Sequence, residues 1–262
     1  MESELKENVI LITGASGGIG RATARAFAAE GASLLLHCHR DRGSATALAA
    51  ELSVPTKVLQ ADVSDEDQVT SMFREGLEEL GRIDALVVNA GIWIEEETPI
   101  HRMTLDQWNK TMAIDLTGAF LTCRGFFRHL AAEPRSKASV VLVASTAGLF
   151  GEENHSDYSA AKAAMAHGLT RTLKNEIVRL APLGRVNCVC PGWVDTPMSA
   201  SSMDDPEAVG RATATMALQK IATADDIARS IVFLTSNELS GHLSGTILPI
   251  AGGMEGRWLH RR

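Results

Sequence analysis

Tyrosine is almost absent from this sequence: its 262 residues include a single one, Tyr158, and aromatic residues together make up 5% of the chain. An excess of basic residues is also missing, since the formal net charge is −7. Nucleic-acid backbones bind to basic surfaces, so this balance excludes nucleic acid as the main partner. Apolar runs of about 18 residues, which a membrane-spanning helix requires, do not occur, so no membrane partner is expected.

Signals for export, for disulfides and for metal binding are lacking as well. The segment from Met1 to Asn8 is charged and has no hydrophobic stretch, so no secretory signal is visible. His37 and His39 have no third ligand in the pattern and do not make a metal site by themselves. The cysteines follow neither a disulfide nor a C-x-x-C pattern; they are Cys38, Cys123, Cys188 and Cys190. These absences predict a cytoplasmic protein with no bound metal.

What the sequence does contain is a regular alternation of short apolar runs and helical patterns. The apolar runs predict strands at Val9–Thr13, Leu34–His37, Lys57–Gln60, Ala85–Val88, Val140–Val143, Val186–Val189 and Thr246–Ile250. The stretches between them predict helices at Ile19–Glu30, Ser44–Leu52, Asp65–Leu80, Leu105–Leu130, Tyr158–Leu180 and Ala224–Leu234. Continuous apolar strands that alternate with helices indicate a doubly wound, mostly parallel sheet with helices on both faces. No linker divides the chain, so residues 1–262 are expected to form one α/β domain, with a substrate lid at 192–220.

A glycine-rich turn, Thr13 to Gly20, follows the first predicted strand. Glycine allows a sharp turn and the close approach of a pyrophosphate, and the start of the next helix offers unpaired N–H groups and the positive end of its dipole. At the first strand-to-helix turn, this cluster predicts a dinucleotide-binding Rossmann fold with a seven-stranded sheet. The residues expected at the cofactor phosphates are Gly14, Ser16, Gly18, Ile19 and Gly20.

The spacing of this turn, T-G-x-x-x-G-x-G, resembles that of the short-chain dehydrogenase/reductase family. Further motifs of that family follow in order: Asp62-Val63, Asn89-Ala90-Gly91, Ser145, Tyr158-Ser159-Ala160-Ala161-Lys162, Pro191-Gly192 and Gly252-Gly253. The resemblance implies a nicotinamide-dependent oxidoreductase, with the aspartate after the third strand on the adenine side. It also implies that Thr196 and the neighbouring backbone, Val194 included, contact the nicotinamide and the phosphates. Overall the chain looks most like the 3-oxoacyl-acyl-carrier-protein reductase branch, whose close relatives reduce many other ketones.

The end of the second strand bears on the choice of cofactor. An NAD-specific site usually has an acid there for the ribose 2′-hydroxyl, but this chain has Cys38, followed by His39 and Arg40. An arginine can bind a 2′-phosphate through its planar fork, so NADP(H) is favoured. Two features point the other way: Asp41 follows directly, and Gly17 stands where NADP-using relatives often carry a basic residue. NAD(H) therefore stays an alternative.

Tyr158 and Lys162 are four residues apart on a predicted helix and therefore share a face. A nearby ammonium lowers the pKa of a phenol from about 10, so Tyr158 is expected to donate a proton to a carbonyl or to take one from an alcohol. Ser145, at the carboxyl edge of the sheet, is expected to hold the substrate oxygen beside it. The resemblance implies that Lys162 also binds the nicotinamide ribose, so Tyr158 and Lys162 are expected to belong to the cofactor site too.

One position departs from the family pattern. The fourth helix reads Ala113-Ile114-Asp115-Leu116-Thr117-Gly118, where the family usually has an asparagine whose backbone carbonyl holds a water of a proton relay. An aspartate keeps that carbonyl, so Asp115 is expected to belong to the catalytic set. Its carboxylate could also pair with Lys162 and weaken the charge that favours the phenolate, which predicts an altered pH response.

The expected substrate is a small carbonyl compound or secondary alcohol, with an acyl thioester among the candidates. Candidate pocket residues are Trp93, Phe150 and Trp193, with Met198, Met203 and Met216 in an adaptable lid and Glu152, Glu153, Asn154 and His155 as residues that could tune specificity. The family commonly forms tetramers, and an apolar tail around Trp258-Leu259 fits an interface, so a homotetramer is expected.

Two other interpretations stay open. An NAD-preferring alcohol or sugar dehydrogenase on the same scaffold would differ in its relative activity with the two cofactors. A catalytically silent NADP-binding regulator would bind the cofactor without turnover. The complete set of Ser145, Tyr158 and Lys162 disfavours the regulator, whereas Asp115 leaves it open.

Overall fold

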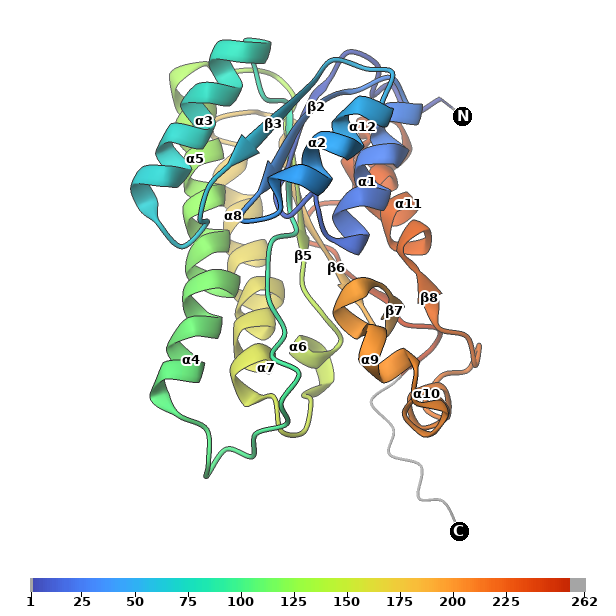
Figure 1. The fold of residues 1–262 in the computed structure, drawn as a ribbon. Coiled ribbons are helices and arrows are strands. Elements are labelled where there is room, and N and C mark those ends of the chain that lie inside the picture. The colour runs from blue at the N-terminus through green and yellow to red at the C-terminus, as the bar shows by residue number, and fades with distance from the viewer. Residues whose placement is uncertain (1, 255–262) are drawn as a thin grey trace.

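The structure is a computed structural model that describes residues 2–254. Its main sheet has seven parallel strands in the order β3-β2-β1-β4-β5-β6-β9 (Figure 1). The strands are β1 (Val9–Ile12), β2 (Ser33–Cys38), β3 (Thr56–Gln60), β4 (Ala85–Val88), β5 (Ser139–Val143), β6 (Arg185–Pro191) and β9 (Ile247–Ile250). The chain builds the sheet outward from β1 to β3 and then returns to place β4 on the other side of β1. This is the doubly wound α/β arrangement of a Rossmann fold, as the alternating pattern predicts.

Helices cover both faces of the sheet (Figure 1). One face carries α1 (Gly18–Ala29), α2 (Arg42–Glu51) and α11 (Ala224–Thr235), and the other carries α3 (Glu66–Leu80), α5 (Gly118–Ala132) and α8 (Thr170–Ile177). The remaining helices are α4 (Leu105–Thr111), α6 (Ala147–Phe150), α7 (Ser156–Ala163), α9 (Ala200–Met203), α10 (Pro206–Thr213) and α12 (Asn237–Ser240). Within residues 2–254, none of these helices has the length and apolar character needed to cross a membrane.

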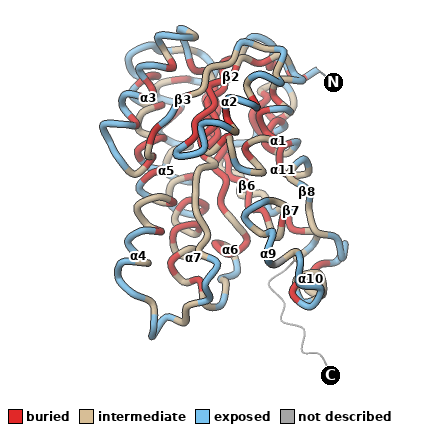
Figure 2. The backbone as a smooth tube through the Cα atoms, in the orientation of Figure 1, coloured by how far each residue is buried: buried red, intermediate tan, exposed pale blue. Residues whose placement is uncertain are grey.

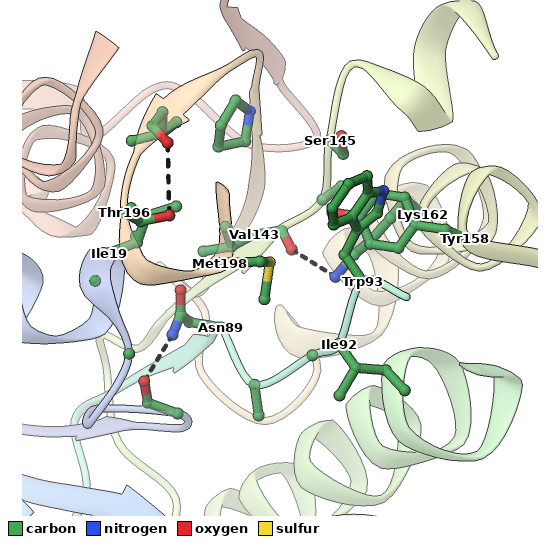
Figure 3. Close-up of a pocket in the computed structure, with 18 of the residues that line it drawn as sticks. Ile19, Asn89, Ile92, Trp93, Val143, Ser145, Tyr158, Lys162, Thr196 and Met198 are labelled. Carbon is green, nitrogen blue, oxygen red and sulfur yellow. Dashed lines mark hydrogen bonds between the residues drawn. The ribbon is translucent and has the colours of Figure 1, made fainter. Parts of the chain in front are cut away.

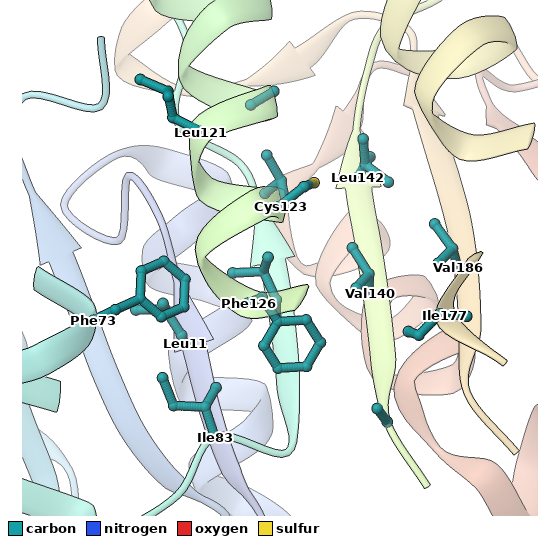
Figure 4. Packing of buried hydrophobic residues seen from close by; sticks show 14 of the residues in the cluster. Leu11, Phe73, Ile83, Leu121, Cys123, Phe126, Val140, Leu142, Ile177 and Val186 are labelled. Carbon is teal, nitrogen blue, oxygen red and sulfur yellow. The ribbon is translucent and has the colours of Figure 1, made fainter. Parts of the chain in front are cut away.

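Each face of the sheet has its own apolar core. Under α3, α5 and α8, large side chains such as Phe73 and Phe126 pack on alternate strand residues such as Leu11 (Figure 4). On the other face, Phe27 packs on residues of opposite parity such as Ile12. Because both faces are covered, every residue of the central strands is buried (Figure 2). That explains the unbroken apolar runs that reveal the strands in the sequence.

Local capping explains where several helices begin. The Asp65 side chain accepts hydrogen bonds from the backbone N–H groups of Asp67 and Gln68 and so starts α3. A reciprocal capping box between Thr223 and Asp226 starts α11. Such bonds satisfy N–H groups that have no partner inside the helix.

The two long helices contain a feature that periodicity does not predict. The helix expected at Leu105–Leu130 is continuous from α4 to α5, but Met112–Thr117 forms a π-helical turn. The helix expected at Tyr158–Leu180 likewise has a π-helical turn at Ala164–Leu169, between α7 and α8. Over six residues a π-helical pattern and an α-helical pattern of apolar residues look alike, and π turns are rare and frequent at functional sites.

The segment expected to form a substrate lid, residues 192–220, contains several short elements for which the sequence analysis predicted no helix or strand. It holds β7 (Val194–Asp195), a 3₁₀ turn at Pro197–Ser199, α9 and α10, and β7 pairs with β8 (Ala222–Thr223). Asp205 caps α10 just before Pro206, and this Asp-Pro start is the signal that the sequence analysis missed. The tail around Trp258-Leu259, expected at an interface, lies outside the described residues.

Candidate active site

The carboxyl ends of the central strands border a cavity of about 690 Å³. Figure 3 shows Ser145, Tyr158 and Lys162 on one side of it and Ile19 and Thr196 on the other. The cavity lies beside the point between β1 and β4 where the strand order reverses, which is where ligands bind in open α/β sheets. Its volume is in the range of small-molecule and cofactor sites, about 300–1,000 Å³.

The glycine turn forms one end of this cavity. The Gly14 N–H donates to Nδ1 of His37 at 3.1 Å, and the other ring nitrogen of His37 lies 3.0 Å from the Ala61 carbonyl. A side chain at Gly20 would collide with the Gly14 carbonyl, so only glycine allows α1 to begin this close to the turn. The buried His37 therefore joins the turn to the ends of β2 and β3, a connection that the sequence analysis missed.

The polar groups after β2 and β3 surround the far end of the cavity. Arg40 and His39 line it and are exposed, whereas Cys38 is fully buried. The Asp41 carboxylate accepts the Ser44 N–H and caps α2. His39 lies 3.7 Å from the Asp62 carboxylate. No carboxylate therefore stands at the last position of β2.

The segment after β4 is fixed to the glycine turn. The side-chain amide of Asn89 donates to the carbonyls of Thr13 and Gly14 at 3.0 and 3.1 Å. The Thr13 hydroxyl in turn accepts the N–H groups of Asn89 and Ala90 at 2.9 and 3.1 Å. These bonds hold the centre of the cavity rigidly, because each of them joins two different strand ends.

Tyr158 and Lys162 come from α7, and Ser145 comes from the end of β5. The Lys162 ammonium lies 5.4 Å from the centre of the Tyr158 ring and 3.4 Å from the Val143 carbonyl (Figure 3). Lys162 is 4% exposed, so its charge acts through protein rather than through bulk water. The Ser145 hydroxyl accepts the Ala147 N–H at 3.1 Å, which orients its oxygen at the start of α6.

Asp115, on the π-helical turn, lies behind the lysine. Its carboxylate is fully buried, with one oxygen 3.1 Å from the Lys162 ammonium and the other accepting the Ile92 N–H at 2.8 Å. Burial raises the pKa of Asp115, and the ammonium and that N–H oppose the rise. The pKa of Lys162 is raised in turn, because the carboxylate and Tyr158 outweigh the effect of burial. The lysine is thus kept charged beside its partner.

The electrostatics of Tyr158 differ from the sequence-based expectation. Burial raises the pKa of Tyr158 above its ordinary value, and the charge of Asp115 adds to the rise. The Lys162 ammonium and the Ser145 hydroxyl act in the opposite direction but do not outweigh it. The prediction of a lowered pKa was wrong in net direction, because it counted the lysine and left out the desolvation of a buried phenol.

Comparisons with known proteins agree with this geometry. The model of a family described as enoyl-(acyl carrier protein) reductase matches residues 14–255. The chain is 36% identical to cis-4-hydroxycyclohexanecarboxylate dehydrogenase of Sinomonas cyclohexanicum, over 97% of this chain and 98% of that protein. It is 32% identical to a 3-oxoacyl-[acyl-carrier-protein] reductase of Synechocystis sp., over 95% of this chain and 98% of that protein. The crystal structure of levodione reductase matches with a TM-score of 0.88 at 32% identity, over 97% of this chain and 100% of that chain.

This chain belongs to the short-chain dehydrogenase/reductase family. Its members use nicotinamide cofactors, so the protein is an oxidoreductase that uses NAD(P)(H). The cavity fits such a cofactor: the start of α1 faces it through Gly18 and Ile19, and Thr196 lies directly against Gly18. A helix start offers N–H groups and a positive dipole end to a pyrophosphate.

In this short-chain dehydrogenase/reductase, nearly all of the site residues named from sequence line the one cavity. They are Gly14, Ser16, Gly18, Ile19, His39, Arg40, Asp62, Val63, Asn89, Ala90, Gly91, Ser145, Tyr158, Lys162, Pro191, Gly192, Val194 and Thr196. Gly20 and Asp115 do not line it; they pack behind the turn and behind the lysine.

The substrate end of the cavity differs from the expectation in part. Trp93, Trp193 and Met198 line it, but Phe150 does not and is 43% exposed. Met203 lies away from it and Met216 is buried against Gly252. Of the four residues expected to tune specificity, 152–155, only Glu152 lines the cavity. His155 is buried, and its ring packs at a tilt against Trp93 with ring centres 4.9 Å apart. Lining residues that the sequence analysis did not place at the site include His37, Lys110, Ile114 and Met254.

Proposed function

We propose that this enzyme is an NADP(H)-dependent ketoreductase that interconverts a carbonyl compound and its secondary alcohol. The observation that carries the proposal is the position of Ser145, Tyr158 and Lys162 on one wall of a cavity whose other end is the glycine turn. The bound nicotinamide supplies or accepts the hydride in this reaction. The residues of the chain then hold the substrate oxygen and move one proton.

The tyrosine and the serine act on the substrate oxygen. Ser145 donates a hydrogen bond to that oxygen and so aims the carbonyl carbon at the nicotinamide. Tyr158 donates its phenolic proton to the oxygen during reduction and takes it back during oxidation. The raised pKa of Tyr158 keeps the phenol protonated at neutral pH, which favours the reducing direction.

Lys162 and Asp115 act behind the tyrosine. The Lys162 ammonium stabilises the phenolate that remains after proton transfer, and it also binds the nicotinamide ribose. Asp115 is a positioning residue: its carboxylate holds the ammonium at 3.1 Å, and its charge sets how strongly the lysine lowers the pKa of Tyr158. Residues 192–220 close over the substrate as a lid.

The preference for NADP(H) rests on the residues after β2. Cys38 offers no carboxylate for a ribose 2′-hydroxyl, and the Asp41 carboxylate, which also lines the cavity, accepts the Ser44 N–H at the start of α2. Arg40 lines the cavity and is exposed, so its guanidinium can reach a 2′-phosphate. His39 is the neighbouring residue, and its ring lies 3.7 Å from the Asp62 carboxylate.

The substrate is best described as a ketone of the 3-oxoacyl type. Support comes from two relatives named 3-oxoacyl-[acyl-carrier-protein] reductases, at 32% and 31% identity. Relatives with other names, such as levodione reductase of Leifsonia aquatica at 35% identity, reduce or oxidise other compounds, so a small ketone is included in the proposal. The proposal also includes that the enzyme is a homotetramer and works in the cytoplasm.

Turnover with a panel of ketones tests the proposal. Steady consumption of NADPH is expected, and consumption of NADH is expected to be slower. Tyr158→Phe should abolish turnover, since phenylalanine has no proton to give, while leaving NADPH binding within about twofold. Binding of NADPH without consumption by any ketone would identify a silent regulator instead, and a preference for NADH would identify the NAD-using alternative.

A further inference from the structure

Glu152 stands in the wall of the cavity at its substrate end. It follows α6 in a short loop whose backbone is fixed to α7. The Glu152 N–H donates to the Ser159 hydroxyl at 3.0 Å, and the Glu152 carbonyl accepts the His155 N–H at 3.2 Å. Ser159 is next to Tyr158, so these bonds hold Glu152 in a constant position relative to the tyrosine.

Within the part of the chain that the structure describes, no cation forms an ion pair with the Glu152 carboxyl. Two further acids, Glu97 and Asp157, act on it and add negative charge. Lys110 on α4 also lines the cavity, but it is exposed, and solvent screens an exposed charge far more than a buried one.

The state of Glu152 follows from these surroundings. Burial raises its pKa to about 7, with Glu97 and Asp157 adding to the rise and Trp93 opposing it. A partly buried carboxyl that forms no ion pair gains free energy when a ligand offers it a further hydrogen-bond donor. An anionic group of a ligand at the same place is repelled by the ionised Glu152 carboxylate, and the poorly solvated wall screens this repulsion weakly.

We propose that Glu152 determines the class of substrate: a ketone or alcohol that carries a hydroxyl or ammonium group on the side away from its reacting carbon, and not a carboxylate or phosphate there. This rests on the proposed function, because it assumes that the reacting carbon lies at Tyr158. It goes beyond that function, because Ser145, Tyr158 and Lys162 act on any ketone alike and select none.

Four ketones built on one ring test this class: cyclohexanone with a methyl, a hydroxyl, an ammonium or a carboxylate group at the carbon opposite the carbonyl. The measurement is kcat/KM with NADPH for wild type, Glu152→Gln and Glu153→Gln. Glu153 is the neighbouring exposed acid and does not line the cavity, so its variant matches the change in charge. Glu152 also raises the pKa of Tyr158, but this effect is common to all four ketones and cancels in their ratios.

At about pH 8 the wild type should prefer the hydroxyl and ammonium ketones and use the carboxylate ketone about tenfold less efficiently than the methyl ketone. At about pH 6 this discrimination should shrink, because Glu152 becomes protonated below its pKa of about 7. Glu152→Gln should raise the ratio of kcat/KM for the carboxylate ketone to kcat/KM for the methyl ketone about tenfold at about pH 8, and it should remove the pH dependence of this ratio. Glu153→Gln should behave as wild type.

Two results would overturn the inference alone. One is a wild type that reduces the carboxylate and methyl ketones equally well at about pH 8. The other is an equal effect of Glu152→Gln and Glu153→Gln on the ratios. If neither these four ketones nor any ketone of the wider panel is reduced, and none of their alcohols is oxidised, with either cofactor, the proposed function fails and this inference fails with it.

Discussion

Replacing Asp115 with asparagine isolates the charge that opposes the catalytic lysine. The side chain keeps its shape and keeps an oxygen to accept the Ile92 N–H, so the variant is expected to fold. It loses the carboxylate that lies 3.1 Å from the Lys162 ammonium. The ammonium then acts on Tyr158 without that opposing charge.

The size of the effect follows from the distances. The ammonium is 3.1 Å from the carboxylate and 5.4 Å from the centre of the Tyr158 ring, so the carboxylate is within about 9 Å of that ring. Two unit charges about 9 Å apart interact by about 1.8 kcal/mol at an effective dielectric constant of about 20. Since one pKa unit corresponds to about 1.4 kcal/mol, Asp115→Asn should lower the pKa of Tyr158 by roughly one unit.

The pH dependence of alcohol oxidation measures this shift. Oxidation needs the phenolate, so kcat/KM falls on the acid side as Tyr158 becomes protonated. In Asp115→Asn this acidic limb should move about one pH unit lower, while the matched variant Asp106→Asn, an exposed acid of α4, should leave it in place. An acidic limb that stays within about 0.3 units of wild type would refute the electrostatic role of Asp115.

Three further predictions concern the cofactor and the fold. Arg40→Ala should raise the KM for NADPH about tenfold and leave that for NADH nearly unchanged; equal effects would remove Arg40 from the 2′-phosphate site. Burial lowers the pKa of His37, so its contribution to stability is present above about pH 6.5 and is lost as pH falls towards the lowered value. In His37→Asn, the free energy of urea unfolding should therefore change less between about pH 7 and pH 5 than in wild type, and an equal slope would contradict the neutral state of His37. Arg185 is buried and donates to the carbonyls of Leu234 and Thr235 at the end of α11, so Arg185→Met should reduce the free energy of unfolding by about 3 kcal/mol or more, and a loss below about 1 kcal/mol would disprove that these bonds stabilise the fold.

The sheet could be predicted from the sequence because its strands are buried on both faces. Runs such as Ala85–Val88 have no polar residue and match the strand in the structure residue for residue. Helix starts with a capping side chain, such as Asp65 before α3, could be predicted because the capping residue lies next to the helix in the sequence. The π-helical turn that holds Asp115 could not, since no residue type marks an extra residue in one helical turn.

The candidate site could be predicted where its residues follow strand ends. Asn89 and Ser145 follow β4 and β5, and parallel strands bring such positions to one edge of the sheet. The loop after α6 is different, because its direction depends on one backbone angle. Gly151 has φ +80°, and this turn leaves Phe150 outside the cavity and brings Glu152 into its wall. The sequence shows the residue types in that loop but does not show which of them the turn directs inward.

The pKa of Tyr158 shows why a correct set of catalytic residues can still give the wrong electrostatics. The sequence places Lys162 one helical turn away, which alone predicts a lowered pKa. The structure adds the burial of the phenol and the charge of Asp115, and together these raise it. A protonated phenol is the form that gives a proton to a carbonyl, and the phenolate is the form that takes one from an alcohol. We therefore infer that the aspartate which replaces the usual asparagine biases this site towards reduction at neutral pH, and that removing its charge brings oxidation into a lower pH range.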